Sequence, residues 1–354
     1  MEKKRIITFD NGNSNKTFNP VIVSASRSTD IPAFYADWFF HRLQVGYSVW
    51  TNPFNGVKSC VSFKHTKFVV FWSKNPRPLL PYLNILKEKG IGCYIQYTLN
   101  DYEGEKLETG VPPLHERIET FKLLVRQLGK TAVIWRFDPM ILTENNTIDD
   151  LLRKVEYIGN QLKGYTEKLV FSYADISSYK RVKTNLENNN IAYREWSEAL
   201  MDEFAFKLST INKVNGWNYN LATCGEKIDI DKYGIAHNRC IDGDLIARLA
   251  WQDEELMRFI GIKIERKPVP GLFGETNIPD NAIKLPGGRY FISTHKKDAG
   301  QRKLCGCMAS KDIGEYNTCP HLCEYCYANA TKSQALDNWE RHQQNQYAAT
   351  ITGK

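Results

Sequence analysis

The feature that most constrains the fold is an alternation of short apolar segments with longer helical patterns across the first two thirds of the 354-residue chain. Six segments have the length and the content of β-branched and aromatic residues that are typical of strands buried on both faces. They are residues 21–25, 68–72, 92–98, 131–137, 168–173 and 217–223. Parallel strands need long crossover connections, which the helical patterns between these segments supply. We therefore expect an α/β fold, a partial (β/α)6 TIM-like barrel of parallel strands.

Polar residues capable of chemistry follow each predicted strand. In parallel barrels the active site gathers at the carboxyl ends of the strands, so we expect these residues to face one site. The candidates are Ser26, Arg27, Asp30, Asn75, Gln96, Arg136 and Ser172. The alternative for each residue is an ordinary helix cap or a satisfied loop side chain.

The second informative feature is a cysteine-rich segment near the C-terminus. Cys319, Cys323 and Cys326 have the spacing CxxxCxxC, with the aromatic Tyr325 before the last cysteine. Three thiolates on one tight loop can hold an inorganic cluster and leave one position open for a small molecule. One alternative is a zinc knuckle with His321 as the fourth ligand. A further alternative, disulfides, would need an oxidising compartment, so the spacing favours an iron–sulfur cluster.

Four further cysteines indicate a second metal site. Cys224 and Cys240 flank one compact segment, and Cys305 with Cys307 forms the sequence CGC. Two separated pieces with two thiolates each would make a four-cysteine site for a second iron–sulfur cluster, which we favour, or for zinc. His237 is a spare candidate ligand, and the alternative is a set of reduced structural cysteines. The remaining two cysteines, Cys60 and Cys93, lie in apolar, strand-like settings.

Composition sets the broad class of the protein. The formal net charge of +7 is compatible with an anionic or nucleic-acid substrate. No apolar run approaches the ~18 residues of a membrane helix. The first twenty residues have no apolar signal-peptide core. We therefore expect a cytoplasmic protein with no membrane partner.

The chain divides into four regions by pattern. Residues 1–20 read as a lead-in, 21–242 as the α/β partial barrel, 243–304 as a helix with an irregular insertion, and 305–354 as the cluster-binding region with a closing helix. Turn signals within 49–63 predict a hairpin excursion.

Several motifs together resemble a known family. SASRSTDIPAFYADWF, FWSKNP, QYTLN and WRFDP, with the C-terminal CGC, DIG, YNTC and CYAN, resemble a bacterial family of uncharacterised proteins. The C-terminal cysteine cluster of that family is likened to the N-terminal cluster of radical S-adenosylmethionine (radical SAM) enzymes. The similarity spans nearly the whole chain except roughly residues 250–295. The loop CPHLCEYCYAN is also similar to that of spore photoproduct lyase and its relatives.

The resemblance implies a cofactor pair and a mechanism. Cys319, Cys323 and Cys326 would hold a 4Fe–4S cluster that binds SAM and cleaves it reductively to start radical chemistry on an unknown substrate. Tyr325 would lie near the adenine, and Ser26, Arg27 and Asp30 near the SAM amino group, although the GGE motif usual there is absent. The other strand-end candidates would line the same cavity. A flavodoxin or ferredoxin would donate the electron.

The resemblance also implies a circular permutation. In radical SAM barrels the cluster loop follows the first strand, whereas here it lies near the C-terminus. We expect 217–223 to take the position of the first strand and 21–25 that of the second, so that the two are neighbours. Closely spaced termini tolerate such rewiring.

A different class of function remains open from the sequence. The chain could be a metal-stapled nucleic-acid-binding protein, with zinc or an iron–sulfur cluster and without SAM chemistry. The net charge of +7 and eight tryptophans would then serve recognition.

Overall fold

A parallel sheet forms the centre of the molecule. The computed structural model describes residues 5–8, 14–267 and 278–354. Within these residues the central sheet has eight strands, and every pairing in it is parallel. From edge to edge the strands are β13 (Ala236–His237), β12 (Asn220–Thr223), β10 (Lys168–Tyr173), β8 (Val133–Met140), β7 (Gly92–Thr98), β6 (Phe68–Ser73), β3 (Ile22–Ala25) and β17 (Lys311–Asp312). The predicted α/β class is confirmed, and each of the six predicted segments contributes a strand.

The order of the strands corrects the expected permutation. Neighbours in the sheet follow the chain order from β3 to β12, so 217–223 and 21–25 lie at opposite ends of the six predicted strands. The expectation that these two segments adjoin is therefore wrong. One neighbour of β3 is β6, and the other is the two-residue β17, in which Lys311 pairs with Val23 and Asp312 with Ser24. A strand this short and polar has no apolar period that sequence analysis can detect.

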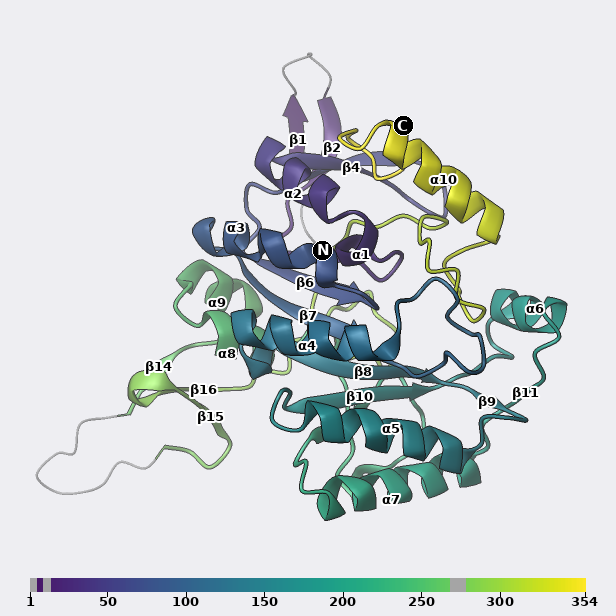
Figure 1. The fold of residues 1–354 in the computed structure, drawn as a ribbon. Helices are drawn as coiled ribbons and strands as arrows, with labels where there is room; N and C mark the ends of the chain where they lie inside the picture. The colour runs from purple at the N-terminus through teal and green to yellow at the C-terminus, as the bar shows by residue number, and fades with distance from the viewer. Residues whose placement is uncertain (1–4, 9–13, 268–277) are drawn as a thin grey trace, which may run out of the picture.

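The two faces of the sheet pack into different apolar clusters because successive side chains of a strand point in opposite directions. On β6, Val69 and Phe71 join one cluster, whereas Phe68 and Val70 join the other. The first cluster contains residues of α1 (Ile31–Phe34), α2 (Ala36–Val45), α3 (Leu83–Glu88), α4 (Leu114–Leu128), α5 (Ile148–Leu162) and α7 (Glu198–Val214). Figure 1 shows α4 and α5 lying across the strands β7, β8 and β10. We call this the helical face.

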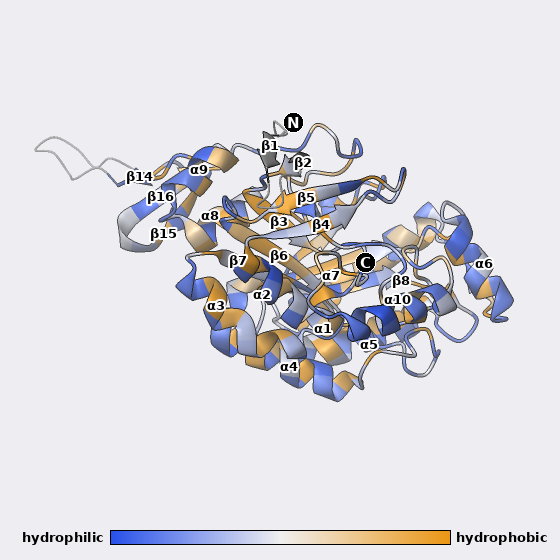
Figure 2. Ribbon diagram, turned by 90° about the horizontal axis from the view of Figure 1, so that it is seen from above, coloured by the Kyte–Doolittle hydropathy of each residue, from blue (hydrophilic) through white to orange (hydrophobic). Residues whose placement is uncertain are grey.

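The second face, which we call the inner face, is covered by the later part of the chain. Its cluster includes residues of α8 (Gly243–Ala250), α9 (Glu254–Ile260), β15 (Ala282–Leu285) and β16 (Arg289–Ile292), together with Cys240, Cys307 and Met308. Figure 2 shows α8 and α9 on the opposite side of β6 and β7 from α3 and α4. Strand β14 (Glu265–Arg266) pairs with β16 beside them. Part of the predicted insertion, residues 268–277, lies outside the described residues.

Smaller elements surround this framework. The predicted hairpin is confirmed as β4 (Tyr47–Thr51) and β5 (Lys58–Ser62), which pair antiparallel. Strand β2 (Ser14–Phe18) pairs with β5 and with β1 (Arg5–Thr8), so the described part of the lead-in extends this second sheet. The remaining elements are β9 (Leu142–Thr143), α6 (Lys180–Asn188), β11 (Tyr193–Arg194), α10 (Lys332–Gln344) and the 3-10 turns η1 (Arg77–Tyr82), η2 (Lys130–Ala132), η3 (Asp231–Tyr233) and η4 (Pro286–Gly288).

Local signals explain where the long helices begin. Thr147 caps α5 in a capping box with Asp150, and Ser197 and Thr331 cap α7 and α10 through their hydroxyls.

Of the helices in the described ranges, none is long and apolar enough to cross a membrane.

The packing of α5 against Trp217 generates a stability prediction. A methyl group on Gly159 would lie 2.5 Å from Cη2 of the Trp217 ring. Alanine normally favours a helix interior over glycine by about 1 kcal/mol, but this clash should reverse the sign. We expect Gly159→Ala to lower the free energy of unfolding by about 1–3 kcal/mol in urea titrations. Gly104→Ala is the control, because nothing lies within 4 Å of its added methyl group. A Gly159→Ala variant as stable as the control would contradict this packing.

Candidate functional site

The cysteine loop, which we define as residues 317–329, is anchored first through β17. Asp312 is the second residue of β17 and pairs with Ser24 of β3. Its carboxylate accepts hydrogen bonds from the backbone N–H groups of Arg27 (2.9 Å) and Gly314 (3.0 Å). A Cβ atom at Gly314 would lie 1.9 Å from Oγ of Ser26, so this approach requires glycine. The turn after β3 and the start of the cysteine loop are therefore packed against each other.

The cysteine loop lies over the carboxyl ends of the central strands. The Nε2 atom of His321 is 2.8 Å from Oδ2 of Asp30, which follows β3, and its Nδ1 atom is 3.0 Å from the Gly110 carbonyl oxygen. The backbone N–H of Glu324 donates to the Leu107 carbonyl in the segment after β7 (3.0 Å). Both ring nitrogens of His321 thus have protein partners, which leaves neither free to serve as the fourth zinc ligand considered from the sequence.

Asp30 connects three parts of this arrangement. Its Oδ1 atom accepts hydrogen bonds from the Ser73 hydroxyl (2.7 Å) and the Ala33 N–H (3.0 Å), which starts α1. Its Oδ2 atom accepts from the Lys74 N–H (2.7 Å) and lies against His321. The carboxylate is 6% exposed and is occupied by protein donors, so it positions the loop instead of presenting a free oxygen to a ligand.

The three thiols of the cysteine loop are close enough to influence one another. Burial raises the pKa of Cys323 well above its ordinary value, and the charges of Cys319 and Cys326 add to that effect. The positive charge of Lys74 opposes this rise in the Cys323 pKa, because its ammonium group lies near the thiol. The N–H of Asn329 donates to the Cys326 sulfur at 3.4 Å. Buried thiols without a positive partner stay protonated, whereas a bound metal would stabilise all three as thiolates.

A buried charged network holds Tyr325. Lys74 Nζ lies 2.8 Å from Oε1 of Glu108 and 2.8 Å from the Tyr325 hydroxyl, which itself donates to Glu108. Asn100 donates to the same Glu108 oxygen at 3.0 Å. Burial alone would raise the pKa of Glu108, but Lys74 and Arg117 outweigh it and lower this pKa to about 2. The Tyr325 hydroxyl is therefore fixed within the protein.

The other strand-end candidates form a second network on the inner face, which Asn100 links to the first through the Asp138 backbone. Arg136 Nη1 donates to Oε1 of Gln96 (3.1 Å) and to the sulfur of Cys240 (3.4 Å). Its Nε donates to Asp138 (3.1 Å), and the Ser172 hydroxyl donates to the other oxygen of that carboxylate. Gln96 and Arg136 therefore contact Cys240 of the second group of cysteines, and Ser172 joins them through Asp138.

The remaining predicted residues, Ser26, Arg27 and Asn75, lie in the turns after β3 and β6. The Ser26 hydroxyl accepts the N–H of Ser28 (2.9 Å), and Asn75 occupies the turn after β6. Arg27 stacks its guanidinium on Trp72 (5.5 Å), and its carbonyl accepts the Tyr327 hydroxyl at 2.6 Å. Its buried Nε has no hydrogen-bond partner.

Two residues that hold the cysteine loop, Asn100 and Glu108, are not among the polar strand-end residues identified from the sequence, whereas Lys74 is one of those residues but not one of the site candidates. Lys74 and Asn100 each stand two residues after a predicted strand, so their position was a usable signal. Glu108 lies in an irregular segment whose sequence gives no indication of burial, because its role depends on a lysine and a tyrosine far away in the chain.

The four remaining candidate cysteines approach each other on the inner face. The Cys224 and Cys240 sulfurs are 3.5 Å apart. Cys307 accepts hydrogen bonds from the N–H groups of Cys240 (3.2 Å) and Ile241 (3.4 Å). Cys305 packs against the same apolar cluster, whereas His237 is exposed at the edge of the sheet. Over the described ranges, no three His, Cys, Asp or Glu side chains are already arranged to hold a metal ion.

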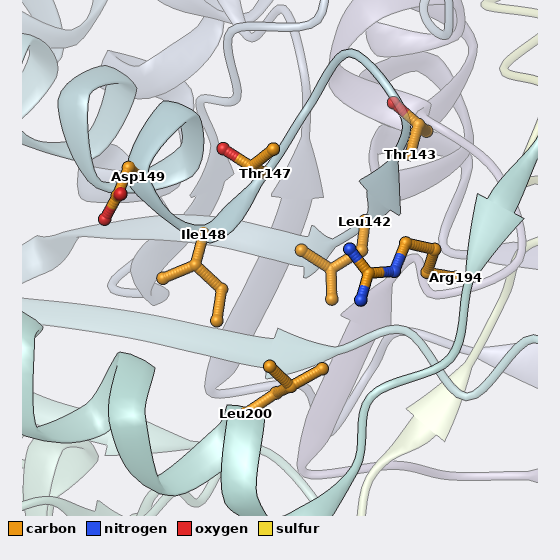
Figure 3. A pocket seen from close by; sticks show the side chains of 7 residues that line it. All are labelled: Leu142, Thr143, Thr147, Ile148, Asp149, Arg194 and Leu200. Atoms are coloured by element: carbon orange, nitrogen blue, oxygen red, sulfur yellow. The ribbon is translucent and has the colours of Figure 1, made fainter.

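A pocket of about 170 Å³ lies elsewhere, between the amino-terminal ends of α5 and α7 and the small pair β9 and β11. Figure 3 shows its lining side chains, Leu142, Thr143, Thr147, Ile148, Asp149, Arg194 and Leu200. None of the predicted site residues lines it, so it does not bear on the cysteine chemistry.

Comparison with known proteins assigns a family. The model of the family described as a domain of unknown function (DUF1848) matches residues 22–328, which include both groups of cysteines. No curated protein and no solved structure matches the chain significantly.

The buried network around Glu108 generates a prediction of pH-dependent stability. Because the pKa of Glu108 is lowered to about 2, its ion pairing stabilises the fold fully above the unfolded value of about 4.3 and is lost as the pH falls towards 2. Glu108→Gln leaves Lys74 buried without its counterion, so we expect the free energy of unfolding at neutral pH to fall by about 3 kcal/mol. The variant should also lose less stability than the wild type on acidification.

The matched control is Glu119→Gln, whose carboxylate is 60% exposed beside Lys122. Its free energy of unfolding should stay within about 0.5 kcal/mol of the wild type. Equal stability of the Glu108→Gln and Glu119→Gln variants at neutral pH would show that the Lys74–Glu108 pair does not stabilise the fold.

Proposed function

The chain belongs to the DUF1848 family, and we propose that this member is a radical SAM enzyme that carries a 4Fe–4S cluster on Cys319, Cys323 and Cys326. The observation that carries the proposal is the position of the cysteine loop in the sheet. The loop is separated by four residues from β17, an edge strand paired with β3, and lies over the carboxyl ends of the strands. A loop placed there faces the end of the sheet at which α/β proteins bind ligands.

The strand order suits the proposed architecture with one change. When β17 takes the position of the first strand, the loop follows the first strand and β3 is its neighbour. The strands β6, β7, β8 and β10 then succeed in order. In this proposal the circular permutation moves the first strand, β17, to the C-terminal part of the chain. The position expected for 217–223 is thus taken by β17. Curvature of the sheet into a partial barrel belongs to this proposal.

The residues present fit the proposed cofactors. Three thiols from one loop leave the fourth corner of a cluster open, and Lys74 beside Cys323 offsets the negative charge of thiolate ligands. The unpaired Nε of Arg27 is a buried donor that a carboxylate such as that of SAM would satisfy. When bound, the cluster supplies the electron that cleaves SAM at its sulfonium centre. A flavodoxin or ferredoxin is the class of protein that would deliver this electron.

The protein's own contribution is to fix the loop. Asp30 orients His321, and the Lys74–Glu108–Tyr325 network holds the segment between Cys323 and Cys326. Cys323 is 8% exposed, whereas Cys319 and Cys326 are partly exposed. Radical chemistry needs solvent to be excluded to prevent side reactions, so the bound cofactors and substrate would have to cover these two thiols. The substrate class is open, and a nucleic acid is one candidate for a protein of net charge +7.

Replacing the three loop cysteines tests the proposal. We expect the wild type, purified anaerobically, to bind about four irons at this loop and to release 5′-deoxyadenosine from SAM when dithionite is added. The Cys319→Ala, Cys323→Ala, Cys326→Ala triple variant should lose that iron and form no 5′-deoxyadenosine. Cys60→Ala is the control, since Cys60 is buried in β5 away from both cysteine groups.

Two results would refute the assignment. Unchanged iron content in the triple variant would show that the loop does not hold the cluster. An iron-loaded wild type that never cleaves SAM but binds nucleic acid would support a metal-stapled binding protein instead.

A further inference from the structure

The four cysteines outside the loop converge from three points of the chain. Cys224 follows β12, Cys240 follows β13, and Cys305 and Cys307 lie in the segment that leads to β17. Cys240 and Cys307 are buried, at 7% and 3% exposure, and the other two pack against the same apolar cluster. Cys240 lies over the middle of the inner face, where the Tyr94 hydroxyl (2.6 Å) and Gln96 (3.0 Å) donate to its carbonyl.

The groups around these sulfurs are hydrogen-bond donors. Two backbone N–H groups, of Cys240 and Ile241, point at the Cys307 sulfur. The Cys240 sulfur accepts hydrogen bonds from Nδ2 of Asn238 (3.3 Å) and Nη1 of Arg136 (3.4 Å). A neutral thiol is a weak acceptor, whereas a thiolate that binds a metal is a strong one and is commonly oriented by such donors. The surroundings therefore suit negatively charged sulfur ligands.

We propose that Cys224, Cys240, Cys305 and Cys307 bind a single zinc ion in a tetrahedral four-thiolate site. Zinc–sulfur bonds of about 2.3 Å place the ligand sulfurs about 3.8 Å apart, at the corners of a tetrahedron. The Cys224–Cys240 separation of 3.5 Å is close to that edge. In a 4Fe–4S cluster each thiolate binds a different iron, which holds the sulfurs apart beyond contact, whereas a 2Fe–2S cluster pairs two thiolates on each iron. The contact between Cys224 and Cys240 thus favours zinc over a second 4Fe–4S cluster, and the iron content measured below distinguishes zinc from a 2Fe–2S cluster.

The thiols must move to complete the site, and Cys305 is the least constrained of them. Its sulfur makes one long contact, 3.7 Å from Oε1 of Gln301, and its side chain is only half-buried. Because no three of these thiols are arranged for a metal ion as the side chains stand, binding requires rotation of Cys305 together with adjustment of the other thiols. Binding releases one proton from each thiol that ionises, and the resulting dianion is partly offset by the neighbouring guanidinium groups of Arg136 and Arg27.

Such a site would join two distant edges of the central sheet. Cys224 follows β12 near one edge, Cys240 lies over the middle of the inner face, and Cys307 lies in the segment that leads to β17 at the other edge. The connecting segment crosses the inner face, where the Met308 N–H donates to the Ile241 carbonyl at 3.0 Å. The zinc ion would hold this segment in place and so steady the strand from which the cysteine loop starts. The site does not depend on SAM chemistry.

Metal analysis of the full chain tests the proposal. We expect one zinc per chain in the wild type by mass spectrometry, and Co²⁺ in its place should give the intense thiolate and tetrahedral absorption bands of a four-sulfur site. Cys240→Ser should lose the zinc and keep the iron of the cysteine loop. The Cys319→Ala, Cys323→Ala, Cys326→Ala variant should lose iron and keep zinc. Cys60→Ala, the control, should keep both metals.

Cys305→Ser is the second variant, because a half-buried ligand can be changed without disturbing the core. It should weaken zinc binding at least tenfold in competition with a chelator. Zinc retained by both the Cys240→Ser and Cys305→Ser variants overturns the proposal. Iron lost from both, with no zinc in the wild type, overturns it in favour of a second cluster. A wild type with neither metal at these positions overturns it in favour of reduced structural cysteines.

Discussion

The carboxylate of Asp30 is the contact on which the cysteine loop depends. Each of its oxygens accepts two hydrogen bonds, from the start of α1, the end of β6 and His321 of the loop. A buried carboxylate is stable only when it is satisfied in this way, so the three elements cannot separate without leaving an unpaired charge. The loop is thereby attached to the rigid sheet through one side chain that contributes no ligand itself.

Charge compensation recurs at both groups of cysteines. Lys74 lies beside Cys323 above the sheet, and Arg136 donates to Cys240 on the inner face. Each cation is in turn paired with a carboxylate, Glu108 and Asp138 respectively, and Asn100 links the two networks through Glu108 and the Asp138 carbonyl. Because buried ion pairs are costly to break, these networks hold their side chains in fixed positions.

The apolar period of the central strands was sufficient to predict the sheet, since segments such as 68–72 and 168–173 are buried on both faces. The apolar period was not sufficient to predict which strands lie at the edges of the sheet. Strand β17 is made by Lys311 and Asp312, which pair with β3 because Asp312 binds the Arg27 N–H, a contact between residues far apart in the sequence. The same limit applies to the site. The spacing of Cys319, Cys323 and Cys326 is local and detectable, whereas the placement of Gln96, Arg136 and Ser172 on the inner face depends on the tertiary structure.

The pairing of β3 with β17 has a consequence for biosynthesis. Residues 22–25 leave the ribosome early, but the strand that covers their edge is made only after residue 310. Because domains form as the chain emerges, β3 to β12 can assemble while one side of the sheet still lacks its last partner. The cysteine loop and α10 are synthesised after these strands and can dock onto a sheet that already exists. A chain truncated before β17 would therefore expose an open strand edge, the feature that promotes aggregation.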